Sequence, residues 1–186
     1  MKHPSAAAVL AIALVYAFPT AGYAAAPSLP STAQIKRGEY LVKATGCADC
    51  HAPLKMGPRG LEPDLARGLS GHPQDITLPP APKTDEPWVW SGSATNTAYA
   101  GPWGVSYATN LTPDNETGIG AWRPEDFIKA IRTGRHAGAG RPIMPPMPWA
   151  AYRNFTDGDL KAIYLYLRSR PAVRNRVPEY QPPQKQ

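Results

Sequence analysis

The sequence has few cysteines: of its 186 residues, only Cys47 and Cys50 carry a thiol. One structural disulfide is therefore the most that the chain could form. Long apolar runs are also missing, since none reaches the roughly 20 residues that a membrane-spanning helix needs. No internal repeat, zinc-finger motif or RNA-binding motif is present. With 42% hydrophobic residues, the chain is sufficient for one modest globular domain with a buried core.

The N-terminus has the layout of a secretory signal peptide. Lys2 precedes an apolar run over positions 6–18, and small residues follow as far as Ala24. Because the run is shorter than a membrane span, an uncleaved anchor is the less favoured interpretation. We therefore expect residues 1–24 to be a signal peptide that is removed during export to the periplasm.

Three segments carry helical signals. The first covers about 32–44, where Ser31 has capping-box spacing to the glutamine three positions on and Gly38 would let another helix cross closely. The second begins near Pro124 and ends at Gly134. Both segments have apolar residues at helical intervals.

The third helical signal is the strongest. Thr156 precedes Asp159 at capping distance, and Pro171 stops the pattern. Between them lies an apolar stripe at positions i, i+3, i+4 and i+7, which consists of Leu160, Ile163, Tyr164 and Leu167.

Two other regions lack such periodicity. The stretch at about 53–108 is dense in proline and glycine, and we expect an irregular insertion there that covers something large. Its aromatic residues could pack over a flat apolar cofactor: Trp88, Trp90, Tyr99, Trp103 and Tyr107. The polar, proline-rich end, 177–186, is consistent either with an ordered wrap or with a frayed end.

The chemistry is concentrated in Cys47-Ala48-Asp49-Cys50-His51, a C-x-x-C-H motif. Two thiols three positions apart can each form a thioether with one haem vinyl group, while the adjacent histidine reaches the iron. A thioredoxin-like redox pair or a structural disulfide would leave His51 and the missing βαβ pattern unexplained. The motif therefore predicts one covalently attached c-type haem, with His51 as an iron ligand.

A low-spin electron carrier needs a second axial ligand, which is often methionine. Met56 lies only five positions after His51, so the chain would have to pass around the macrocycle almost at once. Met144 and Met147 both lie in a stiff proline-rich segment, 141–149, and spacing does not separate them. Two histidines are less favoured candidates for the second ligand, His72 and His136.

The segment Pro145-Pro146-Met147-Pro148-Trp149 resembles the P-x-M-P-aromatic strap of class I cytochromes c, especially the cytochrome subunits that serve periplasmic dehydrogenases. That resemblance points to Met147 as the second iron ligand. It also includes, in order, Arg37-Gly38-Glu39-Tyr40-Leu41, Asn110-Leu111-Thr112-Pro113-Asp114, Thr117-Gly118-Ile119-Gly120-Ala121-Trp122, Asp126-Phe127, Arg132-Thr133-Gly134 and Asp159-Leu160-Lys161-Ala162-Ile163.

The resemblance implies an all-α fold in which the first and last helices cross, with a cytochrome c domain over 25–176. Apart from the resemblance, Trp122, Trp149 and Tyr107 could line the haem pocket, although plain core packing is an alternative. Arg141 could pair with a haem propionate or face solvent.

The leading functional hypothesis is a periplasmic carrier, not an enzyme, that passes single electrons between redox partners through its haem and has no catalytic residues. The first alternative is a permanent electron-transfer subunit of a dehydrogenase or oxidase complex. The second is a haem peroxidase or gas sensor with an open iron site.

The net charge of +6 bears on the partners. It suits either a solvated face or docking to an acidic surface on a dehydrogenase or terminal oxidase. Export makes nucleic acid an improbable partner, and membrane association remains open. The excess lies in the last third of the chain, in Arg132, Arg135, Arg141, Arg153, Lys161, Arg168, Arg170, Arg174 and Arg176.

Overall fold

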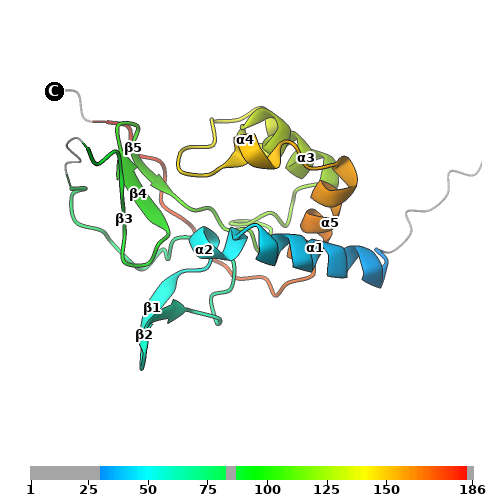
Figure 1. Ribbon diagram of the computed structural model, residues 1–186, viewed down its shortest axis with the longest axis horizontal. Helices are drawn as coiled ribbons and strands as arrows, with labels where there is room; N and C mark the ends of the chain where they lie inside the picture. Colours follow the sequence, from blue (N-terminus) through cyan, green and yellow to red (C-terminus); the bar gives the residue numbers. More distant parts are fainter. Residues whose placement is uncertain (1–29, 83–86, 184–186) are drawn as a thin grey trace, which may run out of the picture.

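The fold is taken from a computed structural model that describes residues 30–82 and 87–183. The predicted signal peptide, 1–24, lies outside the described residues. Within the described residues, helices come first along the chain, short strands follow, and further helices come after the strands (Figure 1). The helical elements are α1 (Thr32–Ala44), α2 (Cys47–His51), α3 (Pro124–Thr133), the 3-10 turn η1 (His136–Gly138), α4 (Trp149–Tyr152) and α5 (Asp157–Arg168).

The three predicted helices are confirmed as α1, α3 and α5. At the start of α1, the Ser31 hydroxyl accepts a hydrogen bond from the Gln34 amide at 3.2 Å, and the Gln34 side chain accepts one from the Ser31 amide. Helix α3 has its proline in the first turn and ends at Gly134, which has a φ of 65°. The Thr156 hydroxyl caps α5 by accepting from the Asp159 amide at 3.0 Å. Local capping chemistry therefore sets these boundaries.

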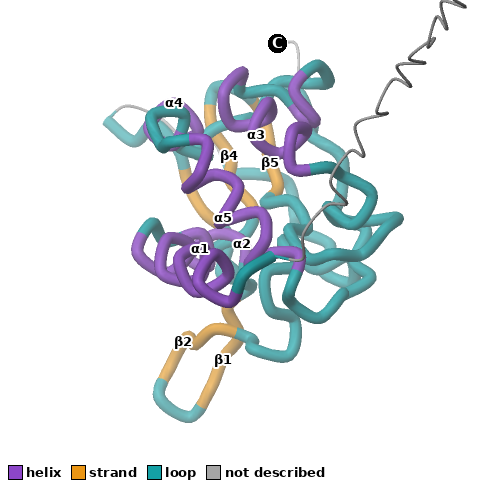
Figure 2. The backbone as a smooth tube through the Cα atoms, turned by 90° about the vertical axis from the view of Figure 1, so that its right-hand side faces the viewer, coloured by secondary structure: helices purple, strands orange, loops and turns teal. Residues whose placement is uncertain are grey.

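Helices α1 and α5 pack against each other (Figure 2), and Gly38 lies at their contact. A Cβ atom at Gly38 would overlap the carbonyl of Ala162 and the Cβ atom of Tyr166, so only glycine permits this approach. The predicted stripe of α5 is entirely buried. It belongs to a core cluster that joins α1, α3 and α5: Leu41, Val42, Ile119, Phe127, Ile131, Leu160, Ile163, Tyr164, Tyr166 and Leu167.

The insertion is not wholly irregular, so the expectation of an all-α fold is incomplete. It holds the antiparallel hairpin of β1 (Leu54–Gly57) and β2 (Gly60–Pro63). It also holds a second antiparallel sheet of β3 (Ser91–Gly92), β4 (Ala98–Gly101) and β5 (Gly104–Tyr107). Strands of two to four residues are too short to show alternation in the sequence.

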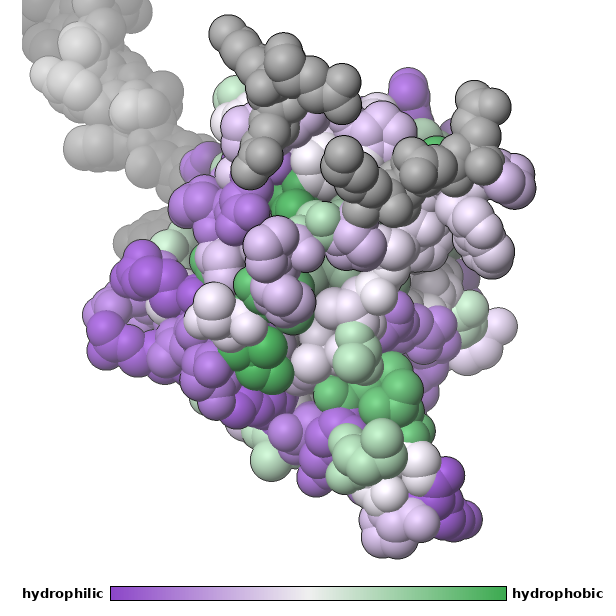
Figure 3. All heavy atoms as spheres, turned by 90° about the vertical axis from the view of Figure 1, so that its left-hand side faces the viewer, coloured by the Kyte–Doolittle hydropathy of each residue, from purple (hydrophilic) through white to green (hydrophobic). Residues whose placement is uncertain are grey.

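The two hairpins turn at glycines and differ in their surroundings. Gly60 and Gly104 adopt positive φ angles of 108° and 96°, which suit glycine. The β1–β2 hairpin projects from the body (Figure 1), and the exposed Met56 and Leu61 form a cross-strand pair on it. On the side of the β3–β5 sheet, separate hydrophobic patches lie among hydrophilic residues (Figure 3).

The C-terminal segment wraps along the molecule as far as residue 183. After α5 it runs back along the molecule to the second sheet (Figure 1). There Gln181 forms an antiparallel bridge with Val105. Within the described ranges, 30–82 and 87–183, no helix has the length and apolarity that a membrane crossing requires.

Candidate functional site

The C-x-x-C-H motif forms a helix of its own, α2, directly after α1. Gly46 starts it in a left-handed conformation, with a φ of 69°, which turns the chain sharply out of α1. Cys47 and Cys50 are both free thiols. Together with His51 they line one large cavity, so the structure brings the three predicted attachment residues to a common wall.

His51 is held in one orientation. Its side chain is 7% exposed, and Nδ1 donates a hydrogen bond to the carbonyl oxygen of Thr109 at 2.8 Å. Burial lowers the pKa of His51 below its ordinary value, and the bond to Thr109 only partly opposes this shift. A neutral ring with its Nδ1 proton engaged leaves Nε2 as the nitrogen that can bind a metal ion.

Cys47 lacks the character of a redox-active thiol. Its Sγ atom lies 3.5 Å from the Thr45 hydroxyl. Burial raises the pKa of the Cys47 thiol, and the contact with Thr45 offsets only part of the shift. Catalytic thiols of thioredoxin-like proteins have lowered pKa values instead, because the thiolate is the nucleophile. The structure therefore gives no support to the redox-pair alternative.

The cavity has a volume of about 620 Å³, within the ~300–1,000 Å³ typical of cofactor pockets. One wall is the helical core, including Leu160 and Ile163. Other walls come from segments far apart in the sequence: the insertion (Trp90, Tyr99 and Tyr107), the methionine segment (Ile143–Pro148) and the C-terminal segment (Arg176–Tyr180).

The insertion also holds α2 in place, which the sequence did not reveal. The Asn96 side-chain amide donates to the Asp49 carbonyl at 2.6 Å. The Tyr99 hydroxyl donates to the Asn96 carbonyl at 2.6 Å, and the Leu54 amide donates to the Thr95 carbonyl at 2.9 Å. Asn96 has a φ of 53°, a conformation that asparagine tolerates better than most residues. An asparagine in a turn-rich stretch is therefore the one sequence signal that could have indicated this role.

The methionine candidates separate into two groups. Met56 is 75% exposed on β1 and does not line the cavity, whereas Met144 and Met147 both do. Met147 also packs against the hydrophobic core. The Ser106 hydroxyl donates to the Pro145 carbonyl at 2.5 Å, which ties the methionine segment to β5.

The two histidine candidates also differ. His72 is fully buried away from the cavity. Its Nδ1 atom lies 2.9 Å from the Thr97 hydroxyl, and its Nε2 atom lies 3.3 Å from the Ile76 carbonyl oxygen, so both ring nitrogens are engaged. His136 does line the cavity, where its ring meets Trp122 edge-on at 4.9 Å between centroids.

Of the aromatic residues suggested for the pocket, Trp122 and Tyr107 line the cavity and Trp149 does not. Trp149 packs instead against Gly134 at the end of α3. Arg141 lies at the cavity and is exposed, which keeps both of its suggested roles open.

Several known proteins have sequences similar to that of this chain. No family model matches the chain. It is 35% identical over 134 residues to the gluconate 2-dehydrogenase cytochrome c subunit of Pantoea cypripedii, across 72% of this chain and 22% of that protein. It is 33% identical over 153 residues to the fructose dehydrogenase cytochrome subunit of Gluconobacter japonicus, across 82% of this chain and 24% of that protein. The chain is similar to the cytochrome c subunits of dehydrogenases.

A third relative is the cytochrome c subunit of the quinone-type alcohol dehydrogenase of Gluconobacter oxydans, 31% identical over 150 residues, across 79% of this chain and 24% of that protein. The chain thus spans less than a quarter of the length of these three relatives. The predicted resemblance to cytochrome c subunits is confirmed. All three names describe cytochrome subunits of dehydrogenases, which agrees with the prediction of an electron carrier that is not itself an enzyme.

The residues of the cavity fit the haem c that cytochrome c subunits carry. Two free thiols and a buried imidazole share its wall. The imidazole has one nitrogen bonded to a backbone carbonyl, as metal-bound histidines usually do. The remaining lining is predominantly apolar and aromatic, which suits a flat macrocycle.

Proposed function

We propose that this chain is an exported electron-transfer subunit of a dehydrogenase complex, with a single haem c in the cavity. The observation that carries the proposal is the common placement of Cys47, Cys50 and the oriented His51 on the wall of a large apolar cavity. The names of the similar proteins favour a complex subunit over the free shuttle that leads from the sequence alone.

Four residues hold the cofactor in this proposal. Cys47 and Cys50 form the two thioethers, His51 binds the iron through Nε2, and Met147 supplies the second axial ligand. Met147 is preferred to Met144 because it packs against the core, so its thioether has less freedom to move away. A bound haem supplies one-electron chemistry at its iron, between the ferrous and ferric states.

The surrounding residues then have supporting roles. Thr109 keeps the His51 ring in one tautomer and orientation through its carbonyl. Asn96 and Tyr99 fix the backbone of α2. The apolar lining excludes water, which strengthens the influence of nearby charges on the iron. None of these residues has to move for an electron to pass, as suits a carrier.

The proposed compartment is the periplasm, because of the signal-peptide pattern in residues 1–24. The proposed partner is a dehydrogenase with an acidic docking surface. Several basic residues near the cavity or on the helices have no carboxylate partner among the described residues, including Arg135, Arg141, Arg153 and Lys161. Such charges steer association more than they strengthen it.

The first test is expression in a host that matures c-type cytochromes, followed by haem staining after denaturing electrophoresis. We expect one haem per chain that survives denaturation, and its loss in a Cys47→Ser, Cys50→Ser variant. A colourless unaltered protein would overturn the proposal.

The second test separates the alternative modes of action. Affinity purification at low and high salt, with dehydrogenase activity assayed in the eluate, is expected to recover a complex that persists at high salt. Absence of dehydrogenase activity from the eluate at both salt concentrations would favour the free shuttle. Rapid carbon monoxide binding to the ferrous protein would favour an open iron site and a peroxidase or sensor instead.

A further inference from the structure

We propose that residues Arg176–Tyr180, here called the C-terminal wall, close one side of the haem cavity against water and thereby raise the reduction potential of the haem. All five residues line the cavity. This inference rests on the proposed function, because it concerns the same cavity. It gives a specific role to a segment that lies beyond the last helix.

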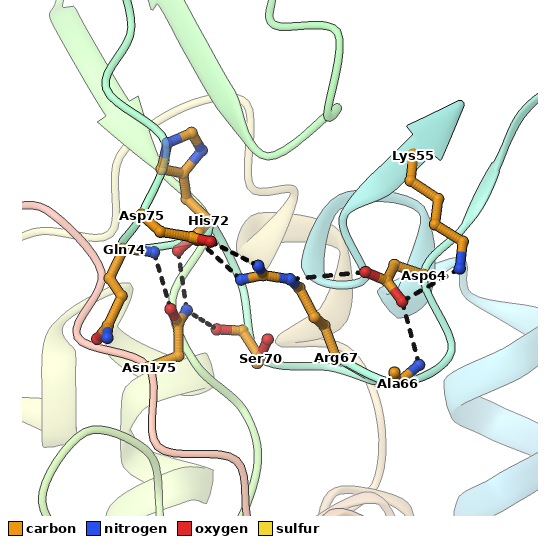
Figure 4. Close-up of polar contacts among 9 residues, drawn as sticks. All are labelled: Lys55, Asp64, Ala66, Arg67, Ser70, His72, Gln74, Asp75 and Asn175. Carbon is orange, nitrogen blue, oxygen red and sulfur yellow. Dashed lines mark hydrogen bonds and ion pairs between the residues drawn. The ribbon is translucent and has the colours of Figure 1, made fainter. Parts of the chain in front are cut away.

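The near end of the wall is anchored by Asn175, which is 3% exposed (Figure 4). Its side-chain amide donates to the carbonyls of Ser70 and His72 at 2.7 and 2.8 Å. Its side-chain oxygen accepts from the Gln74 amide at 2.9 Å. One buried side chain thus satisfies three backbone groups of the insertion and fixes where the wall begins.

The anchored loop is itself stiffened by charge pairs. Arg67 meets Asp75 with two hydrogen bonds, at 2.9 and 2.7 Å, and also lies 3.5 Å from Asp64 (Figure 4). Because the bidentate pair has defined geometry, it restrains the loop on both sides of His72. The near anchor is therefore a rigid part of the insertion.

The far end of the wall is anchored on the second sheet. The Tyr180 hydroxyl donates to the Trp103 carbonyl at 2.5 Å. Gln181 exchanges two backbone hydrogen bonds with Val105, at 2.8 and 2.9 Å. Gly104 has no side chain at the point where the Gln181 carbonyl lies against it. The second sheet therefore fixes the position of the far end of the C-terminal wall.

Between the anchors, the wall divides by exposure. Val177, Pro178 and Tyr180 are partly buried, whereas Arg176 and Glu179 are exposed. Pro178 also restricts the backbone, which limits the number of conformations the segment can adopt. A segment of this kind shields the cavity from solvent, while the charged side chains of Arg176 and Glu179 remain in water.

The effect on the potential follows from the charge of the iron. The ferric state carries one more positive charge than the ferrous state, and water stabilises the more highly charged form. A wall that keeps water out therefore favours the ferrous state and raises the reduction potential. Freeing the wall is expected to lower the potential and to let small hydrophilic reductants reach the haem faster.

The test compares two shortened forms of the full holoprotein. A stop after Glu179 removes Tyr180 and Gln181 and frees the far end, while a stop after Pro183 keeps both anchors and serves as the matched control. We expect unchanged covalent haem in both forms. Only the first should show a lower midpoint potential and a several-fold faster reduction by a small reductant such as ascorbate.

A milder variant covers the case in which the first form does not fold. Tyr180→Phe removes one hydrogen bond at the far anchor and is expected to shift both measurements in the same direction by less. Covalent haem with an unaltered midpoint potential in the form stopped after Glu179, or in Tyr180→Phe where that form does not fold, would overturn the proposed role of the C-terminal wall while leaving the proposed function intact. Absence of covalent haem from the unaltered protein would overturn both.

Discussion

Gly38 of α1 lies directly against the carbonyl group of Ala162 in α5. A methyl group at position 38 would overlap this backbone oxygen, which cannot move aside as the end of a flexible side chain could. The close approach brings together the two helices that form one side of the buried core. The position of α1 determines in turn where α2 begins, because only Thr45 and Gly46 separate the two helices.

Gly38→Ala is therefore expected to destabilise the protein. Alanine gains about 0.5–1 kcal/mol in helix propensity, but overpacking at a helix crossing costs about 1–3 kcal/mol, so the net effect is a loss. Urea unfolding followed by far-UV circular dichroism measures it. Gly158→Ala is the control, since a Cβ atom there meets only the Thr156 hydroxyl at 3.7 Å. Equal stability of the two variants would contradict the crossing argument.

The sequence was sufficient to predict α1, α3 and α5 because their ends depend on local chemistry. The capping residues Ser31 and Thr156 and the terminal Gly134 act within one turn of the backbone. The same is true of the C-x-x-C-H motif, whose thiols and imidazole are adjacent in sequence. Local signals therefore identified both the helical frame and one wall of the cavity.

The remainder depends on contacts between distant residues. Asn96 binds the backbone of Asp49, and Asn175 binds that of Ser70 and His72, yet both asparagines lie in stretches whose composition indicates only loops. The strands of the insertion are stabilised by pairing with one another and with Gln181, and not by an alternating pattern of their own. The aromatic content of the insertion did indicate contact with a cofactor, and Trp90, Tyr99 and Tyr107 line the cavity, but the contacts that position these segments were not predictable.

Met147→Ala is expected to abolish the charge-transfer band between methionine sulfur and ferric iron and to lower the reduction potential, because a thioether ligand favours the ferrous state. Visible absorption of the oxidised protein measures the band. Met144→Ala, also at the cavity, should retain the band, and so should the exposed Met56→Ala. Loss of the band in Met144→Ala alone would assign the second ligand to Met144.

His72 is expected to make the fold sensitive to acid. Burial lowers the pKa of His72, while the hydrogen bond with the Ile76 carbonyl and the nearby Asp75 oppose the shift only in part. The unfolded chain therefore binds a proton more readily than the folded protein does, and stability falls as the pH drops below about 6.5, the ordinary pKa of histidine. The ring of Tyr107 packs against that of His72, with 5.0 Å between the ring centroids, and it carries no charge near pH 6.5.

The measurement is the free energy of unfolding between pH 8 and pH 5, for the unaltered protein and for His72→Asn. The variant should be less stable at pH 8, because it loses at least one hydrogen bond of the ring. Its stability should then fall less steeply toward pH 5, because a titrating group has been removed. His51 and His136 are present in both proteins, so parallel curves would show that His72 makes no contribution.

Asn175→Asp is expected to destabilise the protein by about 3 kcal/mol or more. It removes both donors from the buried carbonyls of Ser70 and His72, at about 1–3 kcal/mol for each unsatisfied group, and places a carboxylate against them. Thermal and urea unfolding report the loss. Asn154→Asp makes the same chemical change at an exposed site and should cost well below this amount.

The order of the cavity walls along the chain has a consequence for assembly. The two thiols come early in the sequence, whereas the methionine segment and the residues that shut the opposite side come after position 140. A polypeptide that emerges from its N-terminus presents both sulfur atoms while the later walls are still absent.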